Sequence, residues 1–150
     1  MYDRMLVAID ASPDSPDDGL TRTTQFATMA GASVHLLHVA RGHLGARDIT
    51  AGAEFGVDPV DVDARERQVV QDAVDRLAAA GIDVHGELVE AIEHDVAGVI
   101  IQRAEELAVD LIVLGHQHHH GSSVAELVIR QRPHCSVLLA RPPEFHGGRR

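Results

Sequence analysis

The feature of this chain that most restricts its fold is the alternation of short, mainly apolar runs with longer amphipathic stretches. The runs lie at residues 4–10, 33–40, 82–90, 110–115 and 135–141. In the clearest of them, "MLVAI" and "LIVLG", aliphatic residues follow one another without polar interruption. Such runs are typical of strands buried on both faces, as in parallel sheets that carry helices on each side. The alternation therefore predicts an α/β protein with a parallel sheet of five strands.

The amphipathic stretches predict four helices. The first follows the turn-rich residues 12–20 and runs to about Ala30, and the others span residues 60–80, 94–108 and 122–131. Gly31 and Gly81 follow the first two helical patterns and are expected to end those helices. Inward positions are expected at Leu20, Phe26, Met29 and Ala30 in the first helix and at Val62, Val69, Val70, Ala73, Val74 and Leu77 in the second.

The order of the elements predicts the arrangement of the strands. Strands and helices alternate, so right-handed crossovers give a doubly wound sheet of order 3-2-1-4-5. Ligands of such sheets bind beyond the carboxyl ends of the strands, where the order reverses between strands 1 and 4. Strand 1 ends at Asp10 and strand 4 at Gly115, and these ends mark the expected site. We expect one domain over residues 1–142 and a flexible tail over residues 143–150.

The composition excludes several classes of function. The formal net charge is −10 and all 13 basic residues are arginine, so the chain is not expected to bind nucleic acid. The single cysteine, Cys135, excludes an intrachain disulfide and a cysteine zinc site, which suits a reducing cytoplasm. No apolar run is long enough to span a membrane, and the first residues lack a signal-peptide pattern. We therefore expect a cytoplasmic protein with no membrane partner.

Several segments together resemble the universal stress protein family of the UspA type. They are "RMLVAIDASPDS", "VHLLHVA", "AEELAVDLIVLG" and "SSVAELVIRQRPHCSVLLAR", and the resemblance covers almost the whole chain. It implies a UspA-like α/β sandwich, usually a homodimer paired through the final strand, with no settled catalytic activity. The sequence contains no Ser-His-Asp spacing, Walker loop or HExxH motif. We therefore expect a non-catalytic stress-response or regulatory module that acts through protein partners.

Many members of the family bind ATP, and the resemblance carries their binding residues over position by position. Asp10 matches the strand-1 aspartate that contacts the base, and Val39 occupies the end of strand 2. The glycine motif after strand 4 reads glycine, two residues, glycine, nine residues, glycine, then serine or threonine. Gly115 matches its first glycine. The base half of the pocket is thus present in this sequence.

The phosphate half of the motif is altered. Ser123 matches the final hydroxyl residue, while His118 and Ser122 replace the other two glycines. Six residues, 116–121, separate Gly115 from Ser122, where the motif has twelve. A phosphate loop aims backbone N–H groups at oxygens, and a shorter loop without glycines offers fewer of them. We therefore expect no tight binding of ATP, and a reduced pocket would instead suit AMP, a cyclic nucleotide or weakly held ATP.

Structural roles are open for the same residues. Ser122 and Ser123 can simply cap the following helix, with Ser123 and Glu126 forming a capping box. Asp10 stands in "DASPDSP", which is rich in turn residues, and can serve only to turn the chain.

The histidines of the loop raise a second hypothesis. The residues are His116, His118, His119 and His120, whose imidazoles could surround one Zn²⁺, Ni²⁺ or Cu²⁺ ion. Crowded imidazoles also repel one another once charged, so the loop is a candidate proton sensor. The histidines His35, His38 and His85 lie within predicted strands and are expected to be structural residues with a polar tip.

The last strand predicts the mode of assembly. The run "SVLLA" at a sheet edge would expose apolar side chains and unpaired backbone groups, which proteins normally cover. Pairing with the same strand of a second subunit under two-fold symmetry solves this problem. We expect a homodimer through Val137, Leu138 and Leu139.

Overall fold

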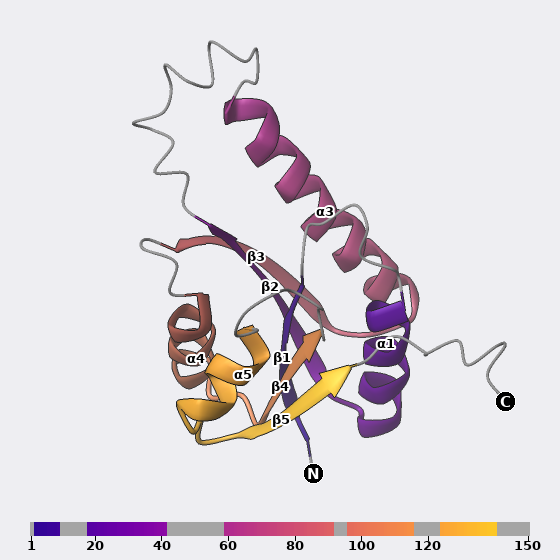
Figure 1. Cartoon of the computed structure of the whole chain (residues 1–150). Helices are drawn as coiled ribbons and strands as arrows, with labels where there is room; N and C mark the ends of the chain where they lie inside the picture. Colours follow the sequence, from indigo (N-terminus) through magenta and orange to yellow (C-terminus); the bar gives the residue numbers. More distant parts are fainter. Residues whose placement is uncertain (1, 10–17, 42–58, 92–95, 116–123, 141–150) are drawn as a thin grey trace, which may run out of the picture.

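The computed structural model describes residues 2–9, 18–41, 59–91, 96–115 and 124–140 (Figure 1). The strands are β1 (Arg4–Ala8), β2 (Ser33–Arg41), β3 (Val84–Ala91), β4 (Leu111–Gly115) and β5 (Ser136–Ala140). The helices are α1 (Asp18–Ala30), α3 (Pro59–Ala79), α4 (Val96–Glu106) and α5 (Val124–Arg130). Strands and helices alternate along the chain, as predicted.

All five strands belong to one parallel sheet of order β3-β2-β1-β4-β5, which confirms the predicted fold class. The central strand β1 pairs with β2 as far as Ala8↔Leu37 and with β4 as far as Ala8↔Leu114. From β1 the chain first builds the sheet outward through β2 and β3, and then returns to β4 on the other side of β1. The order therefore reverses between β1 and β4, where doubly wound sheets bind ligands.

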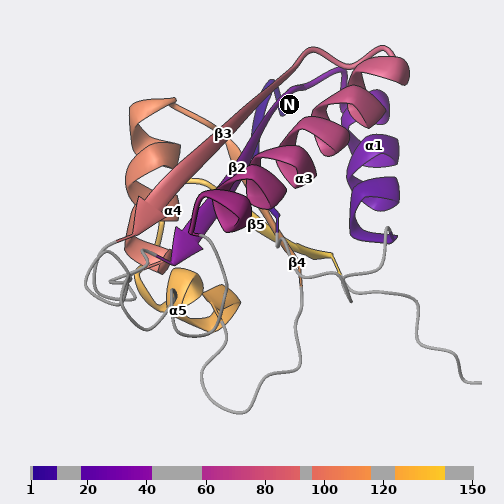
Figure 2. The same ribbon diagram turned by 90° about the horizontal axis from the view of Figure 1, so that it is seen from above.

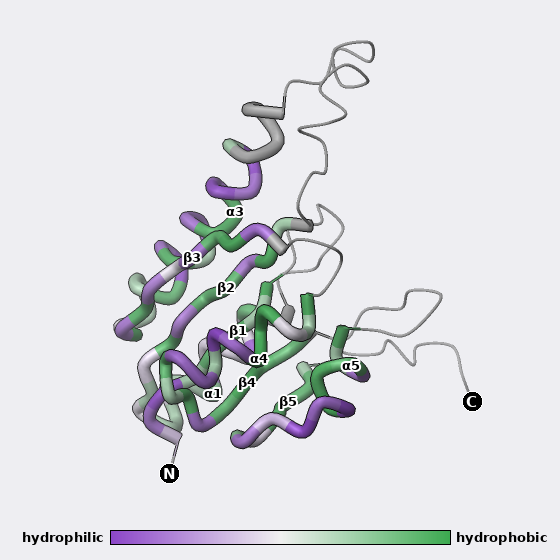
Figure 3. The backbone as a smooth tube through the Cα atoms, turned by 90° about the vertical axis from the view of Figure 1, so that its left-hand side faces the viewer, coloured by the Kyte–Doolittle hydropathy of each residue, from purple (hydrophilic) through white to green (hydrophobic). Residues whose placement is uncertain are grey.

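Two helices cover each face of the sheet, with α1 and α3 on one face and α4 and α5 on the other (Figure 1 and Figure 2). Successive side chains of a strand point to opposite faces, so the central strands supply both cores. On β1, Met5 and Val7 face α1 and α3, whereas Leu6 faces α4 and α5. This double burial explains why the central strands are apolar without alternation, and Figure 3 shows β4 as a hydrophobic strand.

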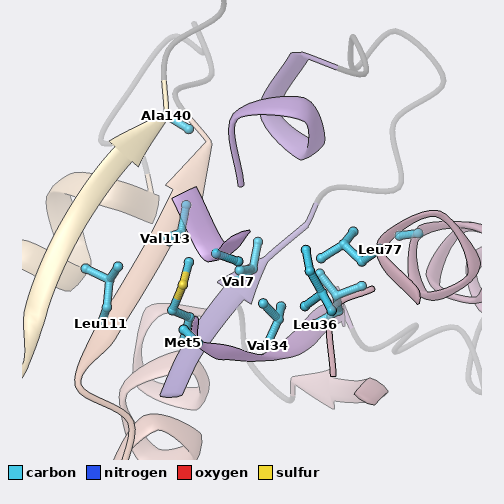
Figure 4. Close-up of a cluster of buried hydrophobic side chains, with 12 residues drawn as sticks. Met5, Val7, Val34, Leu36, Leu77, Leu111, Val113 and Ala140 are labelled. Carbon is cyan, nitrogen blue, oxygen red and sulfur yellow. The ribbon is translucent and has the colours of Figure 1, made fainter. Parts of the chain in front are cut away.

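The core beneath α1 and α3 is aliphatic. Figure 4 shows Leu77 of α3 next to Leu36 of β2, and both side chains are fully buried. Val7 and Val113 extend this core across the centre of the sheet. Small branched side chains fill the space because the chain has few aromatic residues.

The residues of α1 that face the sheet differ from those predicted. Met29 is 88% exposed and Ala30 is exposed as well, so both predicted inward positions are wrong. Thr23 and Ala27 are buried in their place. Residues of a helix are about 100° apart, so Met29 lies about 200° around the helix from Ala27. The buried face of α1 therefore carries Thr23 and Ala27, with Leu20 and Phe26 packed beside them.

Helix α3 crosses β3 at close range. Its predicted stripe is confirmed where the side chains are described: Val70, Ala73 and Leu77 are buried, Val69 and Val74 are half-buried, and the Val62 side chain is outside the described part. A Cβ atom on Gly86 of β3 would lie 2.6 Å from Cγ2 of Val74 and 2.7 Å from Cγ1 of Val70. Position 86 therefore accepts α3 at this distance because it has no side chain.

The ends of the helices follow from backbone conformation. Gly31 and Gly81 have φ angles of +66° and +85°, so each adopts the left-handed conformation that ends a helix, as predicted. Helix α4 ends at Glu106, before the predicted Ala108. Ala108 has a φ of +51°, which is incompatible with continuing the helix.

Tyr2 joins the start of the chain to the far edge of the sheet. Its ring centroid lies 5.8 Å from that of Phe26 in α1, and its hydroxyl donates to Oγ of Ser136 in β5 at 3.1 Å. Phe26 and Leu20 are half-buried against the core, as predicted. Tyr2, two residues before β1, thus links α1 to the edge strand β5.

Candidate functional site

The carboxyl ends of the strands form an uneven edge at the point where the strand order reverses. β1 ends at Ala8 and β4 at Gly115, whereas β2 continues to Arg41. Leu37 is level with Ala8, so β2 extends past the paired end of β1 by four residues, 38–41. Along this extension β2 remains paired with β3. Backbone groups on the β1 side of β2 therefore lie beyond the β1 ladder, next to the switch point.

Two of the predicted nucleotide-binding residues lie at this edge. Val39 is buried, and its side chain belongs to the core beneath α4 and α5, so any polar contact with a ligand must come from its backbone. Gly115 ends β4, where it is level with Ala140 of β5. β1 separates β2 from β4, so Val39 and Gly115 stand on the two sides of the β1 end. Asp10 lies outside the described residues.

The remaining predicted site residues belong to the connection between β4 and α5. The serines Ser122 and Ser123 and the histidines His116, His118, His119 and His120 all lie outside the described residues. β4 ends at Gly115 and α5 begins at Val124, so the connection comprises residues 116–123. Within the described ranges, no group of three or more histidine, cysteine, aspartate or glutamate side chains could hold a metal ion. None of the described helices is long and apolar enough to cross a membrane.

A buried histidine lies at the same edge. The His38 residue is 6% exposed, and Nδ1 of its imidazole is 3.0 Å from the carbonyl oxygen of Ile9, the residue that follows β1. A carbonyl oxygen only accepts hydrogen bonds, so Nδ1 carries a proton and donates. On the other side of the ring, Nε2 lies 3.7 Å from Oε1 of Glu66 in α3. The sequence predicted a structural histidine here, but the contact with the end of β1 was missed.

A signal for this contact was present in the sequence. Val34 and Leu36 alternate with the residues that face α4, so the next position on the α3 side of β2 is His38. A polar residue that continues an apolar face, one position before Val39, indicates a buried hydrogen bond next to the predicted site.

A second polar cluster links α4 to the outer strands. Arg103 donates from Nε and Nη2 to Oε2 of Glu87 at 3.1 and 2.7 Å, and Nε2 of His35 is 2.7 Å from the same oxygen. Burial raises the pKa of Glu87, but the hydrogen bonds from Arg103 and His35 lower it by more. The pKa of Glu87 therefore lies below its ordinary value. The cluster holds α4 against β2 and β3, and it confirms His35 as a structural residue with a polar tip.

A hollow of about 260 Å³ lies at the opposite, amino-terminal edge of the sheet. It is lined by the end of α4, including Ala104 and Ala108, and by Pro133 and Cys135 before β5. Ligand pockets usually exceed about 300 Å³. Burial raises the pKa of the Cys135 thiol, and the charges of Asp110 and Glu105 raise it further. The thiol is therefore a poor nucleophile, and this hollow lacks the features of a catalytic site.

The fold defines a class of protein: a doubly wound α/β domain whose strand order reverses between β1 and β4. Proteins of this class bind their ligands at that point. The sequence profile of the Universal stress protein family matches residues 1–141. The chain belongs to the universal stress protein family, as its resemblance to UspA-type sequences predicted.

Individual relatives agree with this assignment. Universal stress protein A homolog 1 of Coxiella burnetii (strain RSA 493 / Nine Mile phase I) is 30% identical over 122 residues, which are 80% of each chain. The crystal structure of a universal stress protein family member from Burkholderia pseudomallei is 29% identical, with a TM-score of 0.66 over 92% of this chain and 95% of that one. The fold alone is also shared with the universal stress protein from Archaeoglobus fulgidus in complex with dAMP, which is 22% identical, with a TM-score of 0.67 over 92% of this chain and 97% of that one.

Proposed function

We propose that this universal stress protein is a non-catalytic binding module whose ligand is an adenine mononucleotide, AMP or cyclic AMP, bound in preference to ATP. The observation that carries the proposal is the uneven edge, where β2 extends through residues 38–41 beyond the paired end of β1. Backbone N–H and C=O groups along such an edge match the donors and acceptors of a purine base. The relative from Archaeoglobus fulgidus, which has the same fold, is in complex with dAMP.

The preference for a monophosphate rests on the connection between β4 and α5. This connection comprises only residues 116–123, and α5 has seven residues. A triphosphate presents more oxygens than a monophosphate, so binding it takes more backbone N–H groups. A short connection supplies fewer of these groups. The phosphate half of the site, after β4, therefore suits one phosphate better than three.

The test is calorimetry and thermal shift of metal-stripped protein with AMP, cyclic AMP and ATP, each with and without Mg²⁺. We expect saturable micromolar binding of AMP or cyclic AMP and weaker binding of ATP. Asp10→Asn should weaken binding, because the resemblance places Asp10 at the base. Asp83→Asn is the matched control, because Asp83 is exposed and precedes β3 at the opposite edge of the sheet. Tighter binding of ATP than of AMP would contradict the preference for a monophosphate. No detectable binding of any of the three nucleotides would overturn the proposal.

The proposal includes a two-fold homodimer through β5. This strand pairs with β4 on one side and is the last strand of the described sheet on the other. Val137 and Leu139 are half-buried, while Leu138 is 37% exposed. Pairing with a second copy would cover Leu138 and satisfy the free backbone edge. Protein partners in stress signalling would then bind other surfaces of the dimer.

Light scattering at micromolar concentration tests the dimer. We expect the mass of two chains for the wild type and of one chain for Leu138→Glu. Leu127→Glu in α5 is the control, because Leu127 is equally exposed at 36% but lies off the strand edge. A monomeric wild type would contradict this part of the proposal. Turnover of ATP by the purified protein would contradict the non-catalytic part.

A further inference from the structure

The geometry points to a further role for His38: its side chain removes the Ile9 carbonyl from the ladder between β1 and β2, and so holds the binding edge open. The inference rests on the proposed function, because it concerns the same edge. His38 is in this sense a positioning residue, which acts through the backbone of β1 and β2 and has no required contact with the ligand.

The hydrogen bonds at the end of β1 differ from those of a continued ladder. The residue level with Ile9 on β2 is His38, since Ala8 is level with Leu37. In a continued parallel ladder, Ile9 would donate to Leu37 and accept from the N–H of Val39. The first bond is present, from Ile9 N to Leu37 O at 2.9 Å. The second is replaced, because the Ile9 oxygen accepts from Nδ1 of His38 at 3.0 Å, and strand pairing between β1 and β2 ends at Ala8.

The imidazole of His38 has a polar neighbour on each side. His38 lies on the α3 face of β2, where Glu66 approaches Nε2 to 3.7 Å. This gap is too long for a hydrogen bond. Nε2 of His38 and Oε2 of Glu66 are buried and have no hydrogen-bond partner among the described residues. With Glu66 on one side and Ile9 on the other, the ring is held with Nδ1 toward the β1 carbonyl.

The consequence concerns the backbone of β2. The N–H of Val39 points toward the β1 side in a parallel ladder, but the Ile9 oxygen that it would meet is already bonded. The Val39 N–H is thereby directed to the space beyond β1, where the base is proposed to bind. Without the imidazole, Ile9 and Val39 can pair, and one more rung of the ladder would close this position to a ligand.

Three substitutions separate the donor from the size of the side chain. His38→Asn keeps an N–H donor near the position of Nδ1, whereas His38→Gln places its donor near Nε2 and His38→Leu has none. We expect Asn to retain AMP binding and Gln and Leu to weaken it by roughly tenfold, a difference of about 1.4 kcal/mol. Should Leu leave the half-buried Glu66 carboxyl without a polar neighbour and unfold the chain, the double variant His38→Leu/Glu66→Leu restores an apolar contact.

His85 provides the matched control. Its Nε2 is also 3.7 Å from a carboxylate oxygen, that of Asp83, but both side chains are 77% exposed and lie at the other end of the sheet. His85→Leu should leave the dissociation constant for AMP unchanged. An equal loss in His85→Leu and His38→Leu would overturn the inference.

Amide hydrogen exchange supplies a readout that a purely structural role would not produce. In ligand-free His38→Leu, or in the double variant, the Val39 amide should become more protected than in the wild type, because it gains the Ile9 carbonyl. General loosening would instead speed exchange across β1 and β2, and that result would overturn the inference. If wild-type protein binds AMP and His38→Leu binds it equally, the inference fails while the proposed function stands. If the wild type binds no nucleotide, the proposed function fails, and the Val39 exchange still decides whether His38 breaks the ladder.

Discussion

Gly86→Ala is expected to destabilise the protein through a steric conflict that the structure defines. The new methyl group would lie 2.6 Å from Val74 and 2.7 Å from Val70, whereas carbon atoms in contact are about 3.5–4.0 Å apart. Valine side chains are stiff at χ1, so neither methyl can rotate away freely, and α3 has to move from β3. Overpacking of this kind costs about 1–3 kcal/mol. Loss of glycine freedom in the unfolded chain returns about 0.4–1 kcal/mol. At mid-range values of the two effects, the free energy of unfolding should therefore fall by about 1–2 kcal/mol.

Urea denaturation measures this change, and a thermal melt should show a midpoint lower by roughly 2–8 °C for a chain of this size. The sharper test is a double-mutant cycle. Val74→Ala removes one of the two conflicting methyl groups, so Gly86→Ala should cost less in its presence, with a coupling of roughly 0.5–3 kcal/mol. Val128→Ala is the control, because Val128 of α5 is buried in the core on the opposite face of the sheet and should combine additively. Gly86→Ala as stable as wild type, or additive with Val74→Ala, would refute the reasoning.

Two further predictions concern titratable groups. The pKa of Glu87 is lower in the folded chain than its ordinary value of 4.5, so its contacts stabilise the fold above that pH and are lost as the pH falls through the folded pKa. Glu87→Gln should accordingly show a flatter loss of stability in acid than wild type, and identical acid limbs in urea melts would contradict the role of Arg103. Burial raises the pKa of Cys135, so its thiol should react with a disulfide reagent at pH 8 more slowly in the folded protein than in urea. Equal rates would show that the thiol is accessible.

The sequence was sufficient for the features that depend on local pattern. Aliphatic runs such as Leu111–Leu114 predict strands buried on both faces, and their order along the chain leaves few possible topologies. The same reasoning placed Gly115 at the switch point, because parallel strands end at one edge. Val39 came instead from the resemblance to the family. The positions of Gly31 and Gly81 predicted the ends of two helices.

Features that depend on the distance between elements were not predictable in this way. Met29 is larger and more apolar than Thr23, and pattern alone assigned it to the core, yet α1 is turned so that Thr23 is buried and Met29 is exposed. The role of Gly86 depends on how near α3 passes to β3. The contact between His38 and Glu66 joins residues on separate elements, and no periodicity within either segment indicates it.

The contacts of Tyr2 with Phe26 and Ser136 also make this tyrosine an intrinsic fluorescence probe. The chain has one tyrosine and no tryptophan, so its intrinsic fluorescence comes from a single ring. That ring lies against Phe26 and is hydrogen-bonded to Ser136 at the start of β5. Emission and quenching of this phenol therefore report on the docking of the edge strand, without any label. Subunit exchange and refolding can be followed in the native sequence at the strand through which assembly is proposed.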